Sequence, residues 1–163
     1  MKIGILSDTH GRVDSARLGI EALVGRGAEM LVHCGDVGSP EVLDLLVGQR
    51  SLFVFGNCDW DRETLRRHAQ IIGVPCQNAY ADLELDGKRL AIIHGDDAGL
   101  KRRILAEQQH DYLLQGHTHM RDDVMVGRTR LINPGALHRA NPRTVALLDL
   151  ASGALEFIEI AGG

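Results

Sequence analysis

Residues 2–11, KIGILSDTHG, join a short apolar run to a polar loop that contains Asp8 and His10 and ends in Gly11. The apolar run at residues 2–7 predicts a buried strand, and the abrupt change to polar residues and glycine predicts where that strand ends. Asp8 and His10 both carry atoms that can bind a metal ion. This end of the strand is therefore the first candidate for a functional site.

The same arrangement, a glycine next to a potential metal ligand after a buried strand, recurs four more times. The segments are Gly35-Asp36, Gly56-Asn57-Cys58-Asp59, His94-Gly95 and Gly116-His117-Thr118-His119. Ligand sites in open α/β sheets form just beyond the carboxyl ends of the strands. We therefore expect one rim of the fold to bring together Asp8, His10, Asp36, Asn57, His94, His117 and His119.

This set of donors indicates a transition-metal site. Imidazole nitrogens mixed with carboxylate and amide oxygens suit Mn²⁺, Fe, Zn²⁺ or Co²⁺ better than Ca²⁺ or a cysteine-rich zinc site. Seven ligands are too many for one tetrahedral ion, and they fit two ions that share a bridging carboxylate. Each segment taken alone is equally typical of an ordinary turn, so the prediction depends on all five occurring together.

The order of predicted elements indicates an α/β fold. The first half alternates strands with helices at about residues 15–24, capped by Asp14, and 40–47, with Pro40 at its first position. The second half is mostly strands, with a hairpin around Asp86-Gly87 and one helix at residues 98–108. Two sheets packed face to face, with helices outside, satisfy this pattern.

Composition excludes several classes of protein. A length of 163 residues without repeats or linkers predicts one domain, residues 1–163. A net charge of −4 and few aromatic residues exclude a broad nucleic-acid surface, so we expect no duplex nucleic acid as a partner. No apolar run is long enough to cross a membrane and no leader is visible, which predicts a cytoplasmic location.

The ordered motifs resemble those of the calcineurin-like metallophosphoesterase superfamily, D-x-H, G-D, G-N-H-[DE], H and G-H-x-H. The third motif reads Gly56-Asn57-Cys58-Asp59 here, which looks most like the small prokaryotic phosphodiesterase branch. Asn133-Pro134-Gly135 resembles a further segment of the family. The resemblance implies a four-layer α-β-β-α sandwich of two mixed sheets.

The resemblance also implies two divalent metal ions per chain, manganese by preference, with Fe, Zn, Co or Ni as alternatives. One ion would take Asp8, His10, Asp36 and His119. The other would take Asp36, Asn57, His94 and His117. The implied enzyme is a metal-dependent phosphodiesterase that works by in-line attack of a metal-bridging hydroxide. Asp36, Asn57 and His94 would be its catalytic residues.

Three residues near the motifs are candidates for contact with the substrate or support of the ligands. Cys58 stands where many relatives have a histidine that can protonate the leaving group. Arg12 could contact a substrate phosphate, or it is a solvated loop arginine. His138 could approach the same cleft from the segment that follows Gly135.

Two alternatives remain open at this point. The first is a non-catalytic scaffold for protein contacts, as in the retromer scaffold subunit, which resembles this family and has lost part of its metal-binding set. The second is a phosphomonoesterase or nucleotidase. All seven ligand positions hold donor residues here, which favours catalysis over a scaffold. The sequence leaves a homo-oligomer open.

Overall fold

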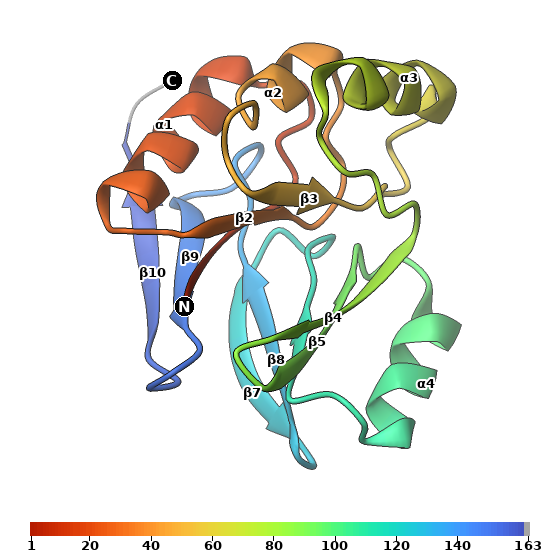
Figure 1. The fold of residues 1–163 in the computed structure, drawn as a ribbon, viewed down its shortest axis with the longest axis vertical. Coiled ribbons are helices and arrows are strands. Elements are labelled where there is room, and N and C mark those ends of the chain that lie inside the picture. Colours follow the sequence, from red (N-terminus) through yellow and green to blue (C-terminus); the bar gives the residue numbers. More distant parts are fainter. Residues whose placement is uncertain (162–163) are drawn as a thin grey trace.

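The structure is a computed structural model that describes residues 1–161, and it contains two mixed sheets packed face to face (Figure 1). The first sheet has the order β10 (Leu155–Ile160), β9 (Arg143–Asp149), β1 (Lys2–Leu6), β2 (Met30–His33) and β3 (Ser51–Phe53). Its strands β1, β2 and β3 are parallel, whereas β9 runs antiparallel to both β1 and β10.

The second sheet is also mixed. Its order is β4 (Tyr80–Leu85), β5 (Lys88–Ile93), β6 (Tyr112–Leu114), β8 (Thr129–Pro134) and β7 (Arg121–Val126). Strands β5, β6 and β8 are parallel, and β4 and β7 are antiparallel edge strands. Each sheet therefore contains three neighbouring parallel strands, which end at the same edge.

Alternation of side chains along the strands produces the layers. On β1, Ile3 and Ile5 pack between the two sheets, whereas Leu6 contacts the helices outside. On β5, Leu90 and Ile92 face the first sheet, and Ile93 belongs to the cluster around helix α4. Successive side chains of a strand point to opposite faces, so strands buried on both sides read as continuous apolar runs.

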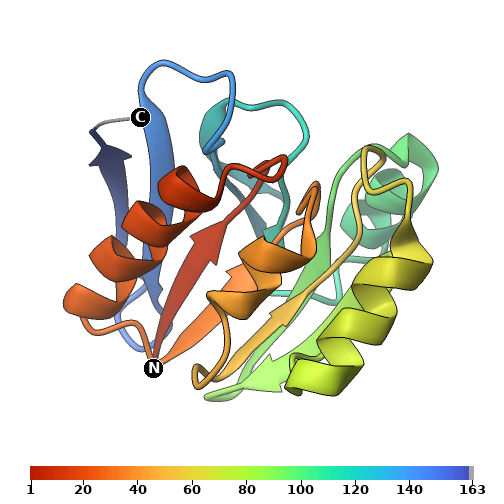
Figure 2. The ribbon, with the colours of Figure 1, turned by 90° about the horizontal axis from the view of Figure 1, so that it is seen from above.

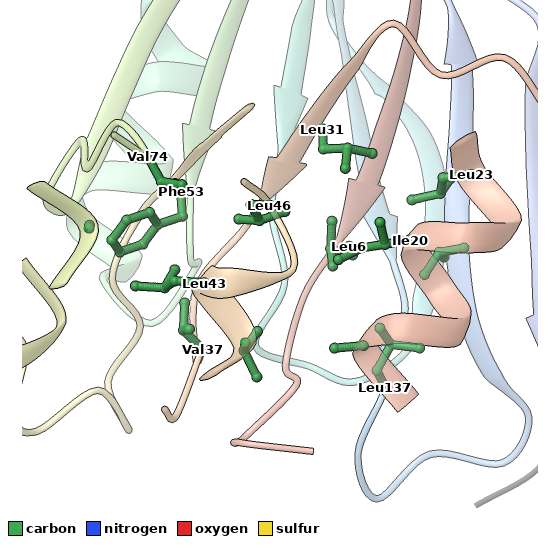
Figure 3. Packing of buried hydrophobic residues seen from close by; sticks show 14 of the residues in the cluster. Leu6, Ile20, Leu23, Leu31, Val37, Leu43, Leu46, Phe53, Val74 and Leu137 are labelled. Atoms are coloured by element: carbon green, nitrogen blue, oxygen red, sulfur yellow. The ribbon is translucent and has the colours of Figure 1, made fainter. Parts of the chain in front are cut away.

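The helices form the two outer layers. Three of them cover the first sheet, namely α1 (Val13–Gly25), α2 (Pro40–Asp44) and α3 (Arg62–Ile72), as Figure 2 shows. Phe53 and Leu43 meet in this layer, as do Leu6 and Ile20 (Figure 3). Helix α4 (Ala98–Glu107) covers the second sheet through Ile104. The predicted α-β-β-α sandwich is confirmed.

Several predicted boundaries are wrong by a few residues. Helix α1 begins at Val13, so Asp14 lies in the first turn and does not cap the helix. Its negative charge there interacts favourably with the positive end of the helix dipole. Helix α2 ends at Asp44, earlier than residue 47. Helix α4 begins at Ala98, where the sequence predicts it, and the Asp97 carboxylate caps it by accepting a hydrogen bond from the Leu100 N–H at 2.9 Å.

The topology brings the loops after five parallel strands to one rim. These are the loops after β1, β2 and β3 of the first sheet and after β5 and β6 of the second. Hydrogen bonds join them across the two sheets: the His117 N–H donates to the Asp8 carboxylate at 3.0 Å, and the His94 ring contacts the Cys34 carbonyl at 2.8 Å. None of the helices within residues 1–161 is both long and apolar enough to cross a membrane.

Candidate metal centre

The Asp8 carboxylate lies at the floor of the rim and faces three imidazoles. The side chain is completely buried, and its Oδ1 is 3.2 Å from His119 Nε2, 3.8 Å from His10 Nε2 and 4.0 Å from His94 Nε2. Among the described residues this oxygen has no hydrogen-bond partner. A buried carboxylate oxygen without a donor is costly, and a cation among these four atoms would satisfy it.

Asp36 lies between the two halves of the cluster. Its Oδ2 is 3.5 Å from His10 Nε2 and 3.3 Å from His94 Nε2, and its Oδ1 accepts a hydrogen bond from the Cys58 N–H at 2.8 Å. Burial opposes ionisation, but His94 and the Cys58 N–H outweigh it and hold the pKa of Asp36 at about 2. The carboxylate is therefore ionised at neutral pH and faces ligands on both sides.

Asn57, His94 and His117 complete the cluster. The Asn57 side-chain oxygen lies 3.1 Å from His94 Nε2 and 3.1 Å from His117 Nδ1. Because the Cys34 carbonyl can only accept, His94 Nδ1 carries a proton in their 2.8 Å hydrogen bond, and Nε2 is the ring nitrogen that faces the cluster. Burial disfavours the charged form of His94, but Asp36 and Asp8 raise its pKa above the usual value.

The backbone of this cluster is strained. Five of its residues, none of them glycine, have positive φ: Asp8 at 54°, His10 at 45°, Asp36 at 54°, His117 at 73° and His119 at 60°. This region disfavours residues with a Cβ, and such outliers gather at functional sites. The fold holds these five residues in an unfavourable backbone conformation, and their side chains lie close together with those of Asn57 and His94.

Close approach explains two of the glycines in the motifs. A Cβ at Gly116 would collide with Ser7 and with the Asp8 carboxylate, and a Cβ at Gly56 would collide with Asp36. Only glycine lets these loops pass so near the carboxylates.

Comparison with known proteins identifies the family. A family model of the calcineurin-like phosphoesterase superfamily domain matches residues 1–153. The chain belongs to the calcineurin-like phosphoesterase superfamily. As a superfamily member it is a metal-dependent hydrolase of phosphoric esters.

Its relatives place it in the branch of small prokaryotic phosphoesterases. The phosphodiesterase MJ0936 of Methanocaldococcus jannaschii is 31% identical over 143 residues, which cover 83% of each chain. The phosphodiesterase YfcE of Escherichia coli K12 is 29% identical over 167 residues, covering 91% of this chain and 88% of YfcE. The structure of an archaeal phosphodiesterase superposes with a TM-score of 0.89 at 27% identity, covering 98% of this chain and 99% of that one.

Asp59 supports the loops that carry the candidate ligands, a role that the sequence did not predict. Its buried carboxylate accepts three backbone hydrogen bonds, from Val37 at 3.2 Å, Gly38 at 2.9 Å and Gly56 at 2.8 Å. It thus ties the loop that carries Asp36 to the loop that carries Asn57. Burial raises the pKa of Asp59, although the three amides oppose the shift. The only indication of this role in the sequence is the position of Asp59 at the end of the Gly56–Asp59 motif.

Asn133 holds the loop that carries His117 and His119. Its side-chain N–H₂ donates to the Gly116 carbonyl at 2.8 Å and to the Thr118 hydroxyl at 3.0 Å, and its oxygen accepts from the Gly135 N–H at 3.0 Å. The Asn133-Pro134-Gly135 segment therefore supports two candidate ligands without being one itself.

The remaining predicted site residues lie around the cluster. Cys58 is near the ligand atoms of His10 and Asp36, and its sulfur accepts from the Asn57 side chain at 3.6 Å. Burial and the charge of Asp36 raise the pKa of the Cys58 thiol. The His138 ring lies 5.2 Å from that of His10, and burial lowers its pKa. Arg12 is exposed and lines a pocket together with His138.

Replacing Asp59 by alanine is expected to loosen both loops. Three backbone N–H groups would lose their acceptor, and two of them belong to the buried residues Val37 and Gly56. Each orphaned buried donor costs about 1–3 kcal/mol, so the free energy of unfolding should fall by at least about 2 kcal/mol. Asp59→Asn keeps one acceptor oxygen and should lose less. Urea denaturation in the presence of EDTA measures the free energy of unfolding of both Asp59 variants, and Glu84→Ala, at an exposed position, is the control. An Asp59→Ala variant as stable as the wild type would show that this clamp has no energetic role.

Proposed function

We propose that the protein is a dinuclear metal-dependent phosphodiesterase whose two ions share Asp36. The observation that carries the proposal is the position of Asp36 Oδ2, within 3.5 Å of a histidine nitrogen on each side. One ion would be held by Asp8, His10, Asp36 and His119. The other would be held by Asp36, Asn57, His94 and His117.

The chemistry of the donors supports this assignment. Asp8 Oδ1, which has no hydrogen-bond partner among the described residues, and His94 Nε2 both face the place where a cation would lie. Mixed imidazole, carboxylate and amide donors favour manganese, with iron, zinc, cobalt or nickel as alternatives. When bound, two such ions supply an activated water as nucleophile and neutralise charge on the phosphoryl oxygens.

The protein's own residues divide into a floor and an open rim. Asp8, Asp36 and His94 are buried and form the floor, whereas His10 and His119 are partly exposed and His117 is exposed. A phosphoester can therefore approach only from the rim side, where the imidazoles lie. Burial and the charge of Asp36 raise the pKa of the Cys58 thiol, and this makes it a poor candidate for the nucleophile.

The substrate we propose is a small phosphodiester or nucleotide-like ester. The relatives named phosphodiesterase support this class. A scaffold without catalysis would not need the strained loops and the buried, unpartnered carboxylate oxygen, because both are unfavourable without a bound cation. The presence of donor residues at all seven ligand positions therefore favours catalysis over a scaffold. Assaying an aryl monoester beside the aryl diester distinguishes a phosphomonoesterase from a phosphodiesterase.

Replacement of the shared carboxylate is the first test. Asp36→Asn should lower the metal content from about two ions per chain to one or fewer, because one oxygen would no longer bridge two sites. Hydrolysis of bis(p-nitrophenyl) phosphate with Mn²⁺ should fall by about a hundredfold or more, since metal ions contribute several kcal/mol to catalysis. Elemental analysis and steady-state kinetics measure these changes.

The matched control for this test is Glu21→Gln, which removes one negative charge from the exposed side of α1. It should keep the metal content and the rate of the wild type. An Asp36→Asn protein with full metal content and full activity would contradict the bridging assignment.

The second test concerns the absence of an imidazole at position 58. A protonated thiol is a weak hydrogen-bond donor, so an alkoxide leaving group should receive little help from Cys58. The wild type should therefore prefer aryl over alkyl diesters by about a hundredfold or more. Cys58→His should reduce this aryl-to-alkyl ratio by about tenfold, because general acid catalysis contributes on this scale or larger.

Cys58→Ser is the matched control, since its hydroxyl keeps the size of the side chain but has no proton to release near neutral pH. Its aryl-to-alkyl ratio should stay close to that of the wild type. An unchanged ratio in Cys58→His would mean that Cys58 only packs against Asn57.

A further inference from the structure

A pocket of about 610 Å³ opens directly beside the candidate metal centre. It lies between the start of helix α1 and the loop that joins β8 to β9. Its lining includes Gly11, Arg12, Ser15, His138, Arg139 and Arg143. Gly11 follows the candidate ligand His10 in the chain, and the His138 ring lies 5.2 Å from the His10 ring. A molecule that lies over the metal centre would therefore be close to this pocket.

The pocket gathers positive charge on a protein whose net charge is −4. Arg12, Arg139 and Arg143 all line it, against one acidic residue, Asp14. Arg12 and Arg139 are exposed, and within residues 1–161 their guanidinium groups make neither a hydrogen bond nor an ion pair. By contrast, the Arg130 guanidinium contacts both oxygens of Asp123, at 2.7 and 2.9 Å. The two pocket arginines thus remain available to a ligand.

The start of helix α1 adds donors to the same pocket. The first N–H groups of a helix have no partner within it, and the side chain of Arg12 at the cap position cannot accept a hydrogen bond. The Val13 N–H donates to the Gly11 carbonyl at 3.0 Å, so the Asp14 and Ser15 N–H groups are the donors at this end. The positive end of the helix dipole therefore points toward the arginines. Arg143 is fixed at this end, because it donates to the hydroxyl of the buried Ser15 at 2.8 Å.

Packing holds the opposite wall in place. Leu137, next to His138, is buried against α1 near Ile20 (Figure 3). It can come so close because α1 has Gly19 at the contact, where a Cβ would lie only 3.0 Å from a Leu137 methyl group. The backbone that carries His138 and Arg139 is therefore set against α1 before any ligand binds.

We propose that this pocket binds a second phosphate group, carried by the alcohol part of the substrate, while the scissile phosphodiester lies over the candidate metal centre. The proposal rests on the proposed function and narrows its substrate class to diesters that bear an additional terminal phosphate. Arginine guanidinium groups bind phosphate oxygens in pairs, and helix N-terminal amides are further donors for them. The volume lies within the range of small-molecule sites and leaves room for the group that links the two phosphates.

Two substrates that differ by one phosphate test this proposal on the manganese-loaded full chain. They are the p-nitrophenyl ester of thymidine 5′-phosphate and the same ester with a 3′-phosphate. The added phosphate should lower the KM of the wild type by about tenfold or more. In Arg12→Gln/Arg139→Gln this advantage should shrink to within about twofold, whereas Arg17→Gln, which removes an exposed arginine of α1 outside the pocket, should keep it.

A binding measurement separates failure of this proposal from failure of the proposed function. Titration calorimetry compares thymidine 3′,5′-bisphosphate with thymidine 5′-phosphate and needs no turnover. Tighter binding of the bisphosphate that is lost in the double variant supports the pocket even if no diester is hydrolysed. Equal affinities in the wild type, or a preference that persists in the double variant, would overturn the proposal while leaving any phosphodiesterase activity in place.

Discussion

Two buried carboxylates, Asp8 and Asp36, impose the constraint on which the rest of this structure depends. Both lie at the ends of adjacent parallel strands, and both face imidazole nitrogens at 3.2–4.0 Å. Charges in such a place are costly unless opposite charge or hydrogen bonds compensate them, and Asp8 Oδ1 has no such bond among the described residues. Divalent cations are the compensation that the surrounding donors favour, and the proposed pair of ions that share Asp36 would give the cluster its chemistry.

The surrounding fold makes this unfavourable arrangement stable. Five residues of the cluster have left-handed backbone conformations, and the loops that carry them are fixed by hydrogen bonds from neighbouring elements. Asp59 joins the loops of Asp36 and Asn57, and Asn133 supports the loop of His117. The two packed sheets with their apolar interior are thus a rigid base on which strained loops can be held without moving.

The strand-end pattern was readable from the sequence because it is local: each apolar run stops at a glycine beside a donor residue. Helix α4 was also predictable, and its cap is equally local, because Asp97 accepts a hydrogen bond from the nearby Leu100 N–H. The start of α1 was not, because Asp14 is as favourable in the first turn as at the cap. The role of Asp59 and the arginine pocket depend on contacts between distant segments, such as Ser15 with Arg143, and local patterns carry no information on these.

The most direct measurement of the shared-carboxylate arrangement is anomalous X-ray scattering from crystals of the protein loaded with Mn²⁺. Two manganese peaks are expected, one beside Asp8, His10 and His119 and the other beside Asn57, His94 and His117, with Asp36 in contact with both. A single peak, or two peaks of which only one contacts Asp36, would contradict a dinuclear centre built on this carboxylate.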